Sequence, residues 1–506
     1  MNIAMIAEMA AEAGANRIAL SDTYGVLAYD ELWDRSRRAA GLLDCHPRDH
    51  VAMIGVNSRL LPIALFGAAL ADKSFVPLNY RWTDDQLVTA VRRLGSAVLV
   101  VDDNMLARSA RMTSETDVTI IGREKFLASV ETSEPAAITG TPAQRPAVQL
   151  FTSGTSGAPK VAVLEHMNLA AYIFGTVELM AAQPGDTQLV SLPPYHVGGI
   201  ANLLSSLYSG RRMVQLDAFD PAGWIKAVRQ HGVTHASVVP TMLARILTAF
   251  ADDPAGGLPT LRHLSYGGGR MPLPVLEDAM RRLPDVGFVN GYGLTETSST
   301  ITVLDPDDHR AAVSSEDPTV RARLGSVGRS LPTVELSVRD PAGKIVAGGE
   351  LGELWVRGEQ VSGRYAGAEA GPNDDGWFRT KDAARIDEEG YVFIEGRLDD
   401  VIVRGGENIS PGEVEDALIG HPDVLDAGVV GLPDDDWGER IAAAVVAAPG
   451  RTPDPAFLQG WVRSRLRSSK TPSTVDVVDT LPYNDNGKLM RRILREQLSS
   501  RTSELQ

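Results

Sequence analysis

A run of hydroxyl and glycine residues that ends in a lysine directly follows an apolar segment. The run covers residues 152–160 and reads TSGTSGAPK, behind the apolar residues 148–151. Glycines lack a Cβ, so backbone N–H groups can close on an anion, while hydroxyls add donors and the lysine adds positive charge. The run is therefore a candidate phosphate-binding loop for a nucleotide, with the candidate ligands Thr152, Ser153, Gly154, Thr155, Ser156, Gly157 and Lys160.

The spacing of this run differs from that of a Walker P-loop. In that motif the lysine follows a glycine directly and precedes Ser or Thr. Here Pro159 precedes Lys160 and Val161 follows it, so a P-loop NTPase is disfavoured. A Ser/Thr/Gly-rich segment by itself is more often a surface turn, so the phosphate interpretation depends on the rest of the chain.

Composition and charge narrow the class of protein. A chain of 506 residues with 43% hydrophobic content should form more than one globular domain. The net charge of -16 disfavours a nucleic-acid surface, which would need clustered Lys and Arg. The single cysteine, Cys45, excludes an intramolecular disulfide framework and fits a reducing cytosol. Residues 1–8 lack the features of a signal peptide and no apolar run could span a membrane, so we predict a soluble cytoplasmic protein.

The order of apolar segments predicts the fold class. Short apolar runs such as 51–54 and 97–101 alternate with helix-like segments such as 60–70, which indicates α/β layers. From about Val334 onward, strand-like segments with Gly-rich turns indicate a β-rich subdomain. We predict a large N-terminal domain of layered α/β subdomains plus this β-rich part over residues 1–398, and a small C-terminal α/β domain over 399–506.

Further motifs follow the first run in a fixed order, and together they carry a family resemblance. The chain resembles adenylate-forming enzymes of the acyl-CoA synthetase family over nearly its whole length. The motifs are PPYH at 193–196, YGLTE at 292–296, GWFRTKD at 376–382, GRLDD at 396–400, GGENI at 405–409 and NGK at 486–488.

The resemblance implies a two-step reaction. A carboxylate attacks the α-phosphate of ATP to give an acyl-adenylate and pyrophosphate, and the thiol of coenzyme A then takes the acyl group. Repulsion between the two anions must be offset by Mg²⁺, lysine and backbone donors. The implied substrates and cofactors are thus a small carboxylic acid, for which we expect a fatty acid, with ATP, Mg²⁺ and coenzyme A.

The resemblance also implies roles for the residues of the motifs. Tyr292 would contact the nucleotide, Thr295 would contact phosphate, and Glu296 would hold the metal ion. Read alone, Thr295 and Glu296 would be a helix N-cap and a first-turn acid.

The later motifs would supply the ribose site and the catalytic lysine. Asp382 would accept hydrogen bonds from the ribose hydroxyls together with Arg397, and Lys488 would neutralise charge between the carboxylate and the α-phosphate. Without the other motifs, the first two would read as a surface ion pair and residues 486–488 as an exposed turn.

The same resemblance assigns the acyl pocket, the hinge and the thiol channel. The small C-terminal domain would be mobile, and the hinge between the half-reactions would be Asp399. His196 would be either a gate or a packed histidine. No basic residue is placed for a second carboxylate, so a dicarboxylic acid is disfavoured. The pocket residues would be His196, Gly267, Gly268, Gly269, Asn290 and Gly291, and the channel residues would be Gly405, Gly406 and Glu407.

Two positions depart from the family pattern. Lys381 and Val161 stand where glycine is common, and Lys381 would either pair with Asp382 or point into solvent. These departures leave open a nucleotide-binding protein that has lost turnover. A separate acyl-carrier protein remains an alternative acceptor to coenzyme A, a luciferase-like oxygenase has no positive support, and a homodimer is left open.

Overall fold

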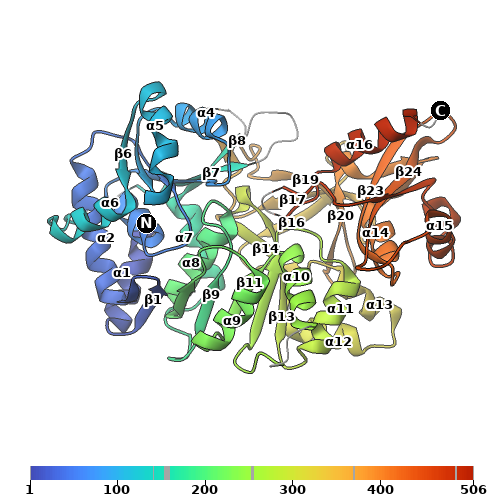
Figure 1. Cartoon of the computed structure of the whole chain (residues 1–506), viewed down its shortest axis with the longest axis horizontal. Helices are drawn as coiled ribbons and strands as arrows, with labels where there is room; N and C mark the ends of the chain where they lie inside the picture. Colours follow the sequence, from blue (N-terminus) through green and yellow to red (C-terminus); the bar gives the residue numbers. More distant parts are fainter. Residues whose placement is uncertain are drawn as a thin grey trace.

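The structure extends from an N-terminal lobe at one end to a C-terminal lobe at the other (Figure 1). The computed structural model describes residues 2–138, 140, 142–152, 160–251, 256–367, 371–484 and 487–504. Among these residues, no helix has both the length and the apolar character that a membrane crossing would need. The predicted α/β class is confirmed, because helices and strands alternate through most of the chain.

The first large sheet has seven strands. Its five strands β7, β4, β3, β5 and β6 are parallel, whereas β8 runs antiparallel to both β7 and β18. In spatial order the strands are β18 (Arg364–Tyr365), β8 (Lys160–Glu165), β7 (Pro146–Thr152), β4 (Ser74–Leu78), β3 (His50–Ile54), β5 (Ala97–Val101) and β6 (Val118–Gly122).

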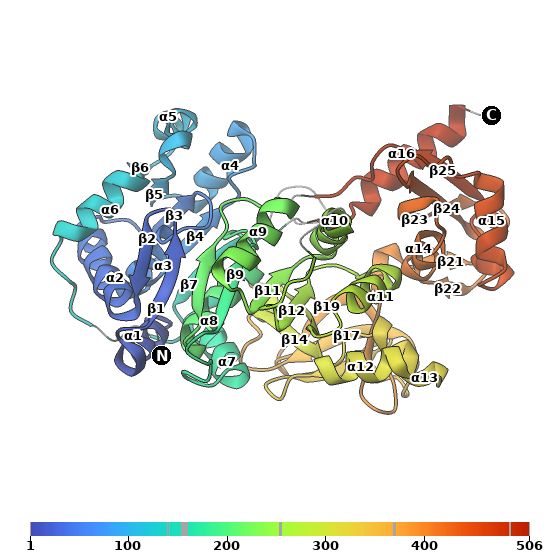
Figure 2. The same cartoon turned by 60° about the horizontal axis from the view of Figure 1, so that its bottom comes forward.

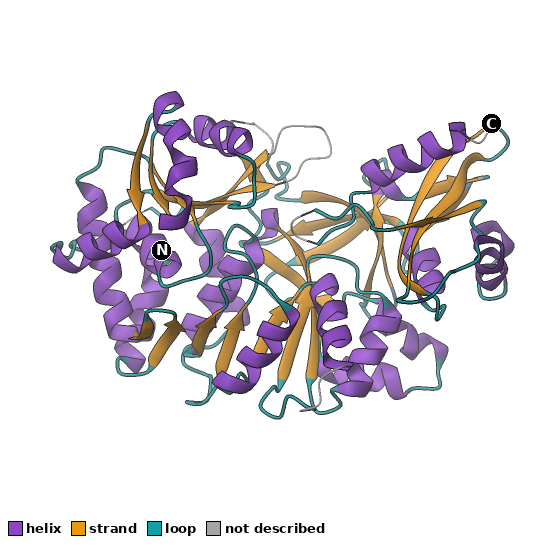
Figure 3. Cartoon of the chain, viewed as in Figure 1, coloured by secondary structure: helices purple, strands orange, loops and turns teal. Residues whose placement is uncertain are grey.

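The second large sheet has nine strands, which Figure 3 shows as a row of arrows with helices on either side. From β13 to β1 the neighbouring strands are parallel, so their carboxyl ends share one edge. The spatial order is β15 (Arg329–Ser330), β14 (Ser299–Leu304), β13 (Gly287–Leu294), β12 (His263–Gly267), β11 (His235–Val238), β9 (Thr187–Val190), β10 (Arg212–Gln215), β1 (Ile18–Asp22) and β2 (Gly25–Ala28).

The largest hydrophobic core lies between these two sheets. Helix α3 (Leu60–Leu70) is apolar on all sides and every one of its residues is buried, as expected for a helix surrounded by protein. The same core contains residues of α1 (Ala4–Gly14), α2 (Tyr29–Asp44), α7 (His166–Thr176) and α8 (Val197–Ser209).

The outer faces of both sheets are covered as well. On β3, Val51 and Met53 enter the central core, while Ala52 and Ile54 join a separate cluster with α4 (Asp84–Leu94). The outer face of the nine-stranded sheet packs against α9 (Pro221–His231), α10 (Pro240–Ala251), α11 (Leu273–Arg282) and α12 (Pro306–Ser314). Successive side chains of a strand point to opposite faces of its sheet, so each sheet packs against an apolar cluster on both faces. The result is a stack of layers.

A four-stranded antiparallel sheet forms the β-rich part that the sequence predicts after Val334. It consists of β16 (Glu335–Arg339), β17 (Gly352–Arg357), β19 (Phe378–Ile386) and β20 (Val392–Arg397).

The C-terminal lobe has its own sheet and its own apolar clusters (Figure 2). Both clusters draw only on residues from Ile402 onward. The strands are β21 (Ile402–Arg404), β22 (Glu407–Ile409), β23 (Val424–Asp434), β24 (Gly438–Ala447) and β25 (Thr474–Val478), and the helices are α14 (Pro411–Ile419), α15 (Pro455–Arg463) and α16 (Arg491–Glu504).

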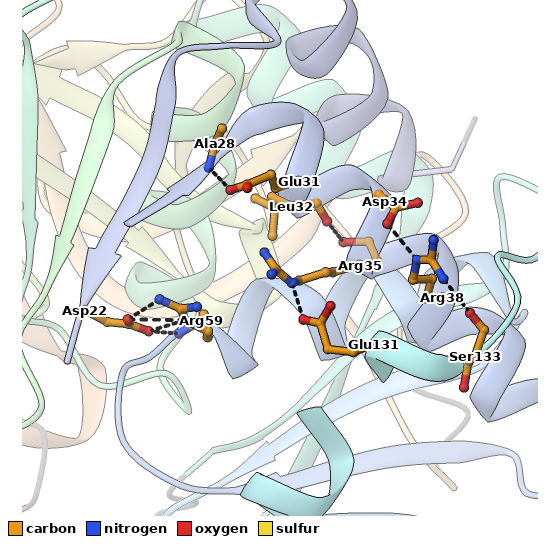
Figure 4. A network of polar contacts seen from close by, with 11 residues as sticks. Asp22, Ala28, Glu31, Leu32, Asp34, Arg35, Arg38, Arg59, Glu131 and Ser133 are labelled. Carbon is orange, nitrogen blue, oxygen red and sulfur yellow. Dashed lines mark hydrogen bonds and ion pairs between the residues drawn. The ribbon is translucent and has the colours of Figure 1, made fainter. Parts of the chain in front are cut away.

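A buried ion pair ties the two large sheets together near the start of α3 (Figure 4). Asp22, at the end of β1, accepts hydrogen bonds from the Arg59 backbone N–H at 3.0 Å and from Arg59 Nη2 at 2.7 Å. The side chains of Asp22 and Arg59 are 1% and 13% exposed.

Asp22→Ala should lower the free energy of unfolding by about 3 kcal/mol, because the largely buried charge of Arg59 would lose its carboxylate partner. Urea unfolding followed by tryptophan fluorescence measures the change. The control is Asp34→Ala, which breaks the more exposed pair with Arg38 and should cost less than about 1 kcal/mol. Equal losses in the two variants would contradict this interpretation.

Candidate active site

Asp382 is the centre of a hydrogen-bonded cluster where β19 and β20 lie side by side. Its carboxylate accepts from the Tyr292 hydroxyl at 2.6 Å and from Arg397 Nη1 at 3.0 Å. Asp382 is only 4% exposed, and it stands opposite Arg397 in the strand register. Burial, followed by the negative charge of Asp382, raises the pKa of Tyr292 well above its ordinary value, so Tyr292 remains a donor. Each carboxylate oxygen keeps a second lone pair, which fits paired ribose hydroxyls.

A bulge in β19 sets the direction of the Asp382 side chain. Residues 380–382 of β19 stand opposite the single residue Leu354 of β17. The Thr380 hydroxyl donates to the Leu354 carbonyl at 2.7 Å and accepts from the Asp382 N–H at 3.1 Å. Such a bulge redirects the side chain that follows it.

Lys381 lies within this bulge with a φ of 61°. This left-handed conformation favours glycine, which explains why glycine is common at the position. The Lys381 backbone N–H donates to Glu353, and its side chain is exposed, with no ion pair to Asp382 among the described residues. Of the two alternatives for Lys381, the structure favours the one in which it faces solvent. Val161, the second departure, is a buried residue of β8.

Glu296 lies in a short 3₁₀ turn (Thr295–Thr297) that follows β13 and also contains Thr295. The Tyr365 hydroxyl donates to Glu296 Oε1 at 2.5 Å, and Lys160 Nζ lies 5.2 Å from the centroid of the Tyr365 ring. Burial, followed by the charge of Glu296, raises the pKa of Tyr365, which keeps its proton. Glu296 and Lys160 therefore both lie next to Tyr365.

The candidate phosphate loop is described only at its two ends. Thr152 and Lys160 face each other where β7 ends and β8 begins, and the Thr152 hydroxyl donates to the Lys160 carbonyl at 3.4 Å. The predicted ligands Ser153, Gly154, Thr155, Ser156 and Gly157 lie outside the described residues.

The residues near Glu296 fit a magnesium ion held mainly by substrate. The described part of the chain contains no group of three or more His, Cys, Asp or Glu side chains suited to a metal. Mg²⁺ is commonly held by one or two carboxylates plus the phosphates of a nucleotide, so a single carboxylate at Glu296 is compatible with it.

Lys488 reaches this region from the C-terminal lobe. It ends a tight turn in which its N–H donates to Asn484 Oδ1 at 2.9 Å. A Cβ on Gly487 would come within 2.5 Å of Thr241 Oγ1, so the turn sits directly on the start of α10. Burial lowers the pKa of Lys488, whereas the nearby carboxylate of Asp382 favours its charged form. Lys488 nevertheless keeps an exposed surface that a ligand could contact.

His196 caps the N-terminus of α8 and lies within range of the charge of Lys488. Its Nδ1 accepts from the Gly198 N–H at 3.1 Å, which leaves the ring proton of the neutral form on Nε2. Burial, with a smaller effect from Lys488, lowers the pKa of His196 to about 4, so the ring is neutral at pH 7.

One face of the nine-stranded sheet beside His196 is incompletely covered. Ser237, Ser265 and Val289 are neighbours on β11, β12 and β13, and all three are half-buried in the interior of the sheet. Asn202 of α8 is half-buried as well, and its Nδ2 donates to Ser237 Oγ at 3.0 Å. The half-buried residues of α8 are Gly198, Asn202 and Ser205, whose spacing of four and three places them on one side of the helix.

The predicted glycines lie at the end of this face where β12 ends. Gly267 and Gly291 are register partners, and a Cβ on Gly267 would come within 2.3 Å of the Gly291 carbonyl oxygen. Gly268, with a φ of 78°, and Gly269 continue toward the start of α10, where Val239 and Pro240 lie near them. The side chain of Asn290 donates to the Ser326 carbonyl, on the face of β13 opposite to that of Gly291.

The predicted hinge and channel residues lie beyond β20. Asp399 is exposed in the 3₁₀ turn Leu398–Asp400. Gly405 and Gly406, with φ of 58° and 81°, form the two-residue turn between β21 and β22, beside Glu407. Such a turn needs positive φ at both positions. Among the described residues, Gly405 donates its N–H to the Trp437 carbonyl and Glu407 pairs with Arg467, and neither contacts the Asp382 cluster.

Sequence reasoning missed Tyr365 and Thr380, which position Glu296 and Asp382. Tyr365 lies in β18, a two-residue strand whose pairing with β8 has no local sequence signal. Thr380 stands inside the motif at 376–382, but its role depends on the bulge.

Comparisons with known proteins find relatives along nearly the whole chain. The chain matches the AMP-binding enzyme family over residues 7–366 and the AMP-binding enzyme C-terminal domain over residues 413–488. It is 33% identical to the fatty acid–[acyl-carrier-protein] ligase ScoC of Streptomyces coeruleorubidus, over 93% of this chain and 91% of that enzyme. It is 34% identical to the feruloyl-CoA synthase of Amycolatopsis sp, over 93% and 94% of the two chains.

Among solved structures, ATP-bound MatB from Rhodopseudomonas palustris superimposes with a TM-score of 0.85 at 27% identity, over 98% of this chain and 99% of MatB. Apo MatB gives 0.77 at 28% identity, with the same coverage. The relatives are ligases that join acids to coenzyme A or to a carrier protein, and the motif-based resemblance is confirmed. The chain belongs to the AMP-binding enzyme family of adenylate-forming ligases.

Proposed function

We propose that this protein is an ATP-dependent ligase that activates a carboxylic acid, with a fatty acid as the first candidate, and transfers the acyl group to the thiol of coenzyme A. The observation that carries the proposal is the position of Lys488, which lies within electrostatic range of both Asp382 and His196. This position links the candidate ribose site to the candidate acyl site.

In the first half-reaction, a carboxylate oxygen bonds to the α-phosphorus and the bond from that phosphorus to pyrophosphate breaks. We assign Asp382, Arg397 and Tyr292 to the ribose, because they form one hydrogen-bonded cluster. Lys488 places its ammonium where negative charge from both reactants meets, and a fixed cation there stabilises the transition state.

The phosphate side of the site is assigned to residues around Glu296. Thr295 and the loop at 152–160 would donate to phosphate oxygens, and Lys160 would add positive charge. Mg²⁺, when bound at Glu296, would offset the charge of the phosphates. Tyr365 orients the Glu296 carboxylate through its hydroxyl.

In the second half-reaction, the thiol sulfur bonds to the acyl carbonyl carbon, AMP leaves, and the thiol proton passes to solvent. We propose that residues 399–506 rotate about Asp399 as a separate domain between the two steps, so that Gly405, Gly406 and Glu407 line the thiol channel. The separate cores of the two lobes support independent movement. The better superposition on ATP-bound than on apo MatB supports an adenylating arrangement here.

A second candidate acceptor is the thiol of a separate acyl-carrier protein. The similarity to ScoC, a ligase of fatty acids and an acyl-carrier protein, favours it. Supplying the protein with ATP, an acid and either acceptor, followed by mass spectrometry of the thioester, decides between the two.

The acyl group is proposed to lie along the half-buried face that begins at Gly267 and Gly291. This face contains Val289, but also Asn202 and Ser237, which form a polar pair. An acyl group with an oxygen substituent would find hydrogen-bonding partners there, which an unsubstituted chain would leave unused.

Lys488→Ala should reduce pyrophosphate release with an acid panel by about 10²- to 10³-fold, because the transition state loses a fixed cation. Thioester formation from a supplied acyl-adenylate and coenzyme A should remain. An unchanged rate of pyrophosphate release would contradict the assignment. Pyrophosphate release by the wild-type enzyme with no acid of the panel would contradict the proposed function itself, whatever the variant does.

Asp399→Pro should retain pyrophosphate release and lose thioester formation by about 100-fold or more, since the thiol channel would be misplaced. Proline fixes φ near -65°, close to the φ of a 3₁₀ turn, so the present arrangement tolerates it while rotation does not. Asp399→Ala is the control and should retain both half-reactions. Equal loss of both in the proline variant would refute the hinge.

Asn202→Leu should shift the ratio of kcat/KM for an unsubstituted over an oxygen-substituted acid of equal length by about tenfold toward the unsubstituted acid. The ratio within one variant cancels any loss of folded enzyme. An unchanged ratio would show that Asn202 does not contact the acyl group.

A further inference from the structure

We propose that Arg270 is a positioning residue for the first half-reaction. By binding Asp416, it holds the C-terminal lobe in the orientation that places Lys488 beside Asp382. This inference rests on the proposed function and deepens it, because it names the contact that selects the adenylating orientation.

The two residues lie on opposite sides of the hinge. Arg270 follows the glycines 267–269, within the part of the chain that matches the AMP-binding enzyme family, and Asp416 belongs to the matched C-terminal domain. Arg270 Nη1 donates to Asp416 Oδ1 at 2.8 Å, and Nη2 donates to Oδ2 at 2.5 Å. Two parallel bonds between a guanidinium and a carboxylate define the angle between their carriers as well as the distance.

The helix that carries Asp416 also rests on Arg270. A Cβ on Gly412 would come within 2.3 Å of Arg270 Nε. Gly412 and Asp416 are four residues apart on α14, so they share one side of the helix. Arg270 therefore contacts α14 both through its planar side chain and through its charge.

A second ion pair joins α14 to the segment of the catalytic lysine. Glu415, next to Asp416, accepts two hydrogen bonds from Arg491 at 2.5 and 3.0 Å. Arg491 stands three residues after Lys488, and it also donates to the Val429 carbonyl at 2.6 Å. The orientation of α14, set by Arg270, is thus passed on to Lys488 through contacts within the C-terminal lobe.

The Arg270–Asp416 pair can exist in only one of the two proposed orientations. Asp416 moves with the C-terminal lobe, whereas Arg270 does not, so rotation about Asp399 separates them. A contact present in one state alone shifts the equilibrium toward that state. The pair therefore favours the first half-reaction and opposes the second.

The test is to measure the two half-reactions separately. Arg270→Ala and Asp416→Asn should each lower the rate of pyrophosphate release by about tenfold, while thioester formation from supplied acyl-adenylate stays equal or rises. The double variant should be no slower than either single variant, since both changes remove the same contact. The charge-reversed pair R270D/D416R should recover part of the lost rate.

Arg281→Ala is the matched control. Arg281 lies on α11, and its pair with Asp278 involves no residue of the C-terminal lobe, so neither half-reaction should change. Equal loss of both half-reactions in Arg270→Ala, or additive losses in the double variant, would overturn the inference.

A structural measurement separates this inference from the proposed function. If the wild-type enzyme released no pyrophosphate with any acid, hydrogen exchange would still report the contact. The backbone amides of Val239, Thr241 and residues 398–401 should exchange faster in Arg270→Ala than in Arg281→Ala. Equal exchange in the two variants would overturn the positioning role.

Discussion

The central constraint on the candidate site is that Lys488 belongs to a different part of the molecule from the buried carboxylate of Asp382. Asp382 is buried between Tyr292 and Arg397 in a rigid antiparallel pair of strands, whereas Lys488 ends a turn in a lobe with its own hydrophobic core. Gly487, next to Lys488, rests on the start of α10, and from there the charge of Lys488 reaches the cluster. The geometry of the site therefore depends on how two independently packed bodies meet.

The parallel strands of the nine-stranded sheet form one side of the candidate site. Their carboxyl ends share an edge, where polar residues and glycines after β11, β12 and β13 are brought together. Ligands of open α/β sheets commonly lie at this edge. Gly267 and Gly291 have no space for a side chain between them, so the backbone itself forms the surface near the proposed acyl group.

Around this edge of the sheet, backbone strain and ion pairs hold the candidate site residues in position. Lys381 adopts a left-handed backbone conformation within the bulge that orients the Asp382 side chain. Arg270 and Arg491 flank α14 and connect the edge of the sheet to the lysine segment. These contacts lie at the boundary of the two lobes, where a change of orientation would alter them first.

The sequence by itself determined the α/β class and the family, and it supplied the candidate residues of the site. Strand alternation and helical periods are local, and Asp382, Glu296 and Lys488 stand in short motifs whose spacing is visible along the chain. Only the tertiary structure decided that Tyr365 supports Glu296, because β18 pairs with β8 across about two hundred residues of sequence. It also decided that Lys381 faces solvent, that Asn290 turns away from Gly291, and that Arg270 meets Asp416. Each of these depends on register, on a bulge or on the docking of two lobes, and such long-range geometry has no local pattern from which it could be predicted.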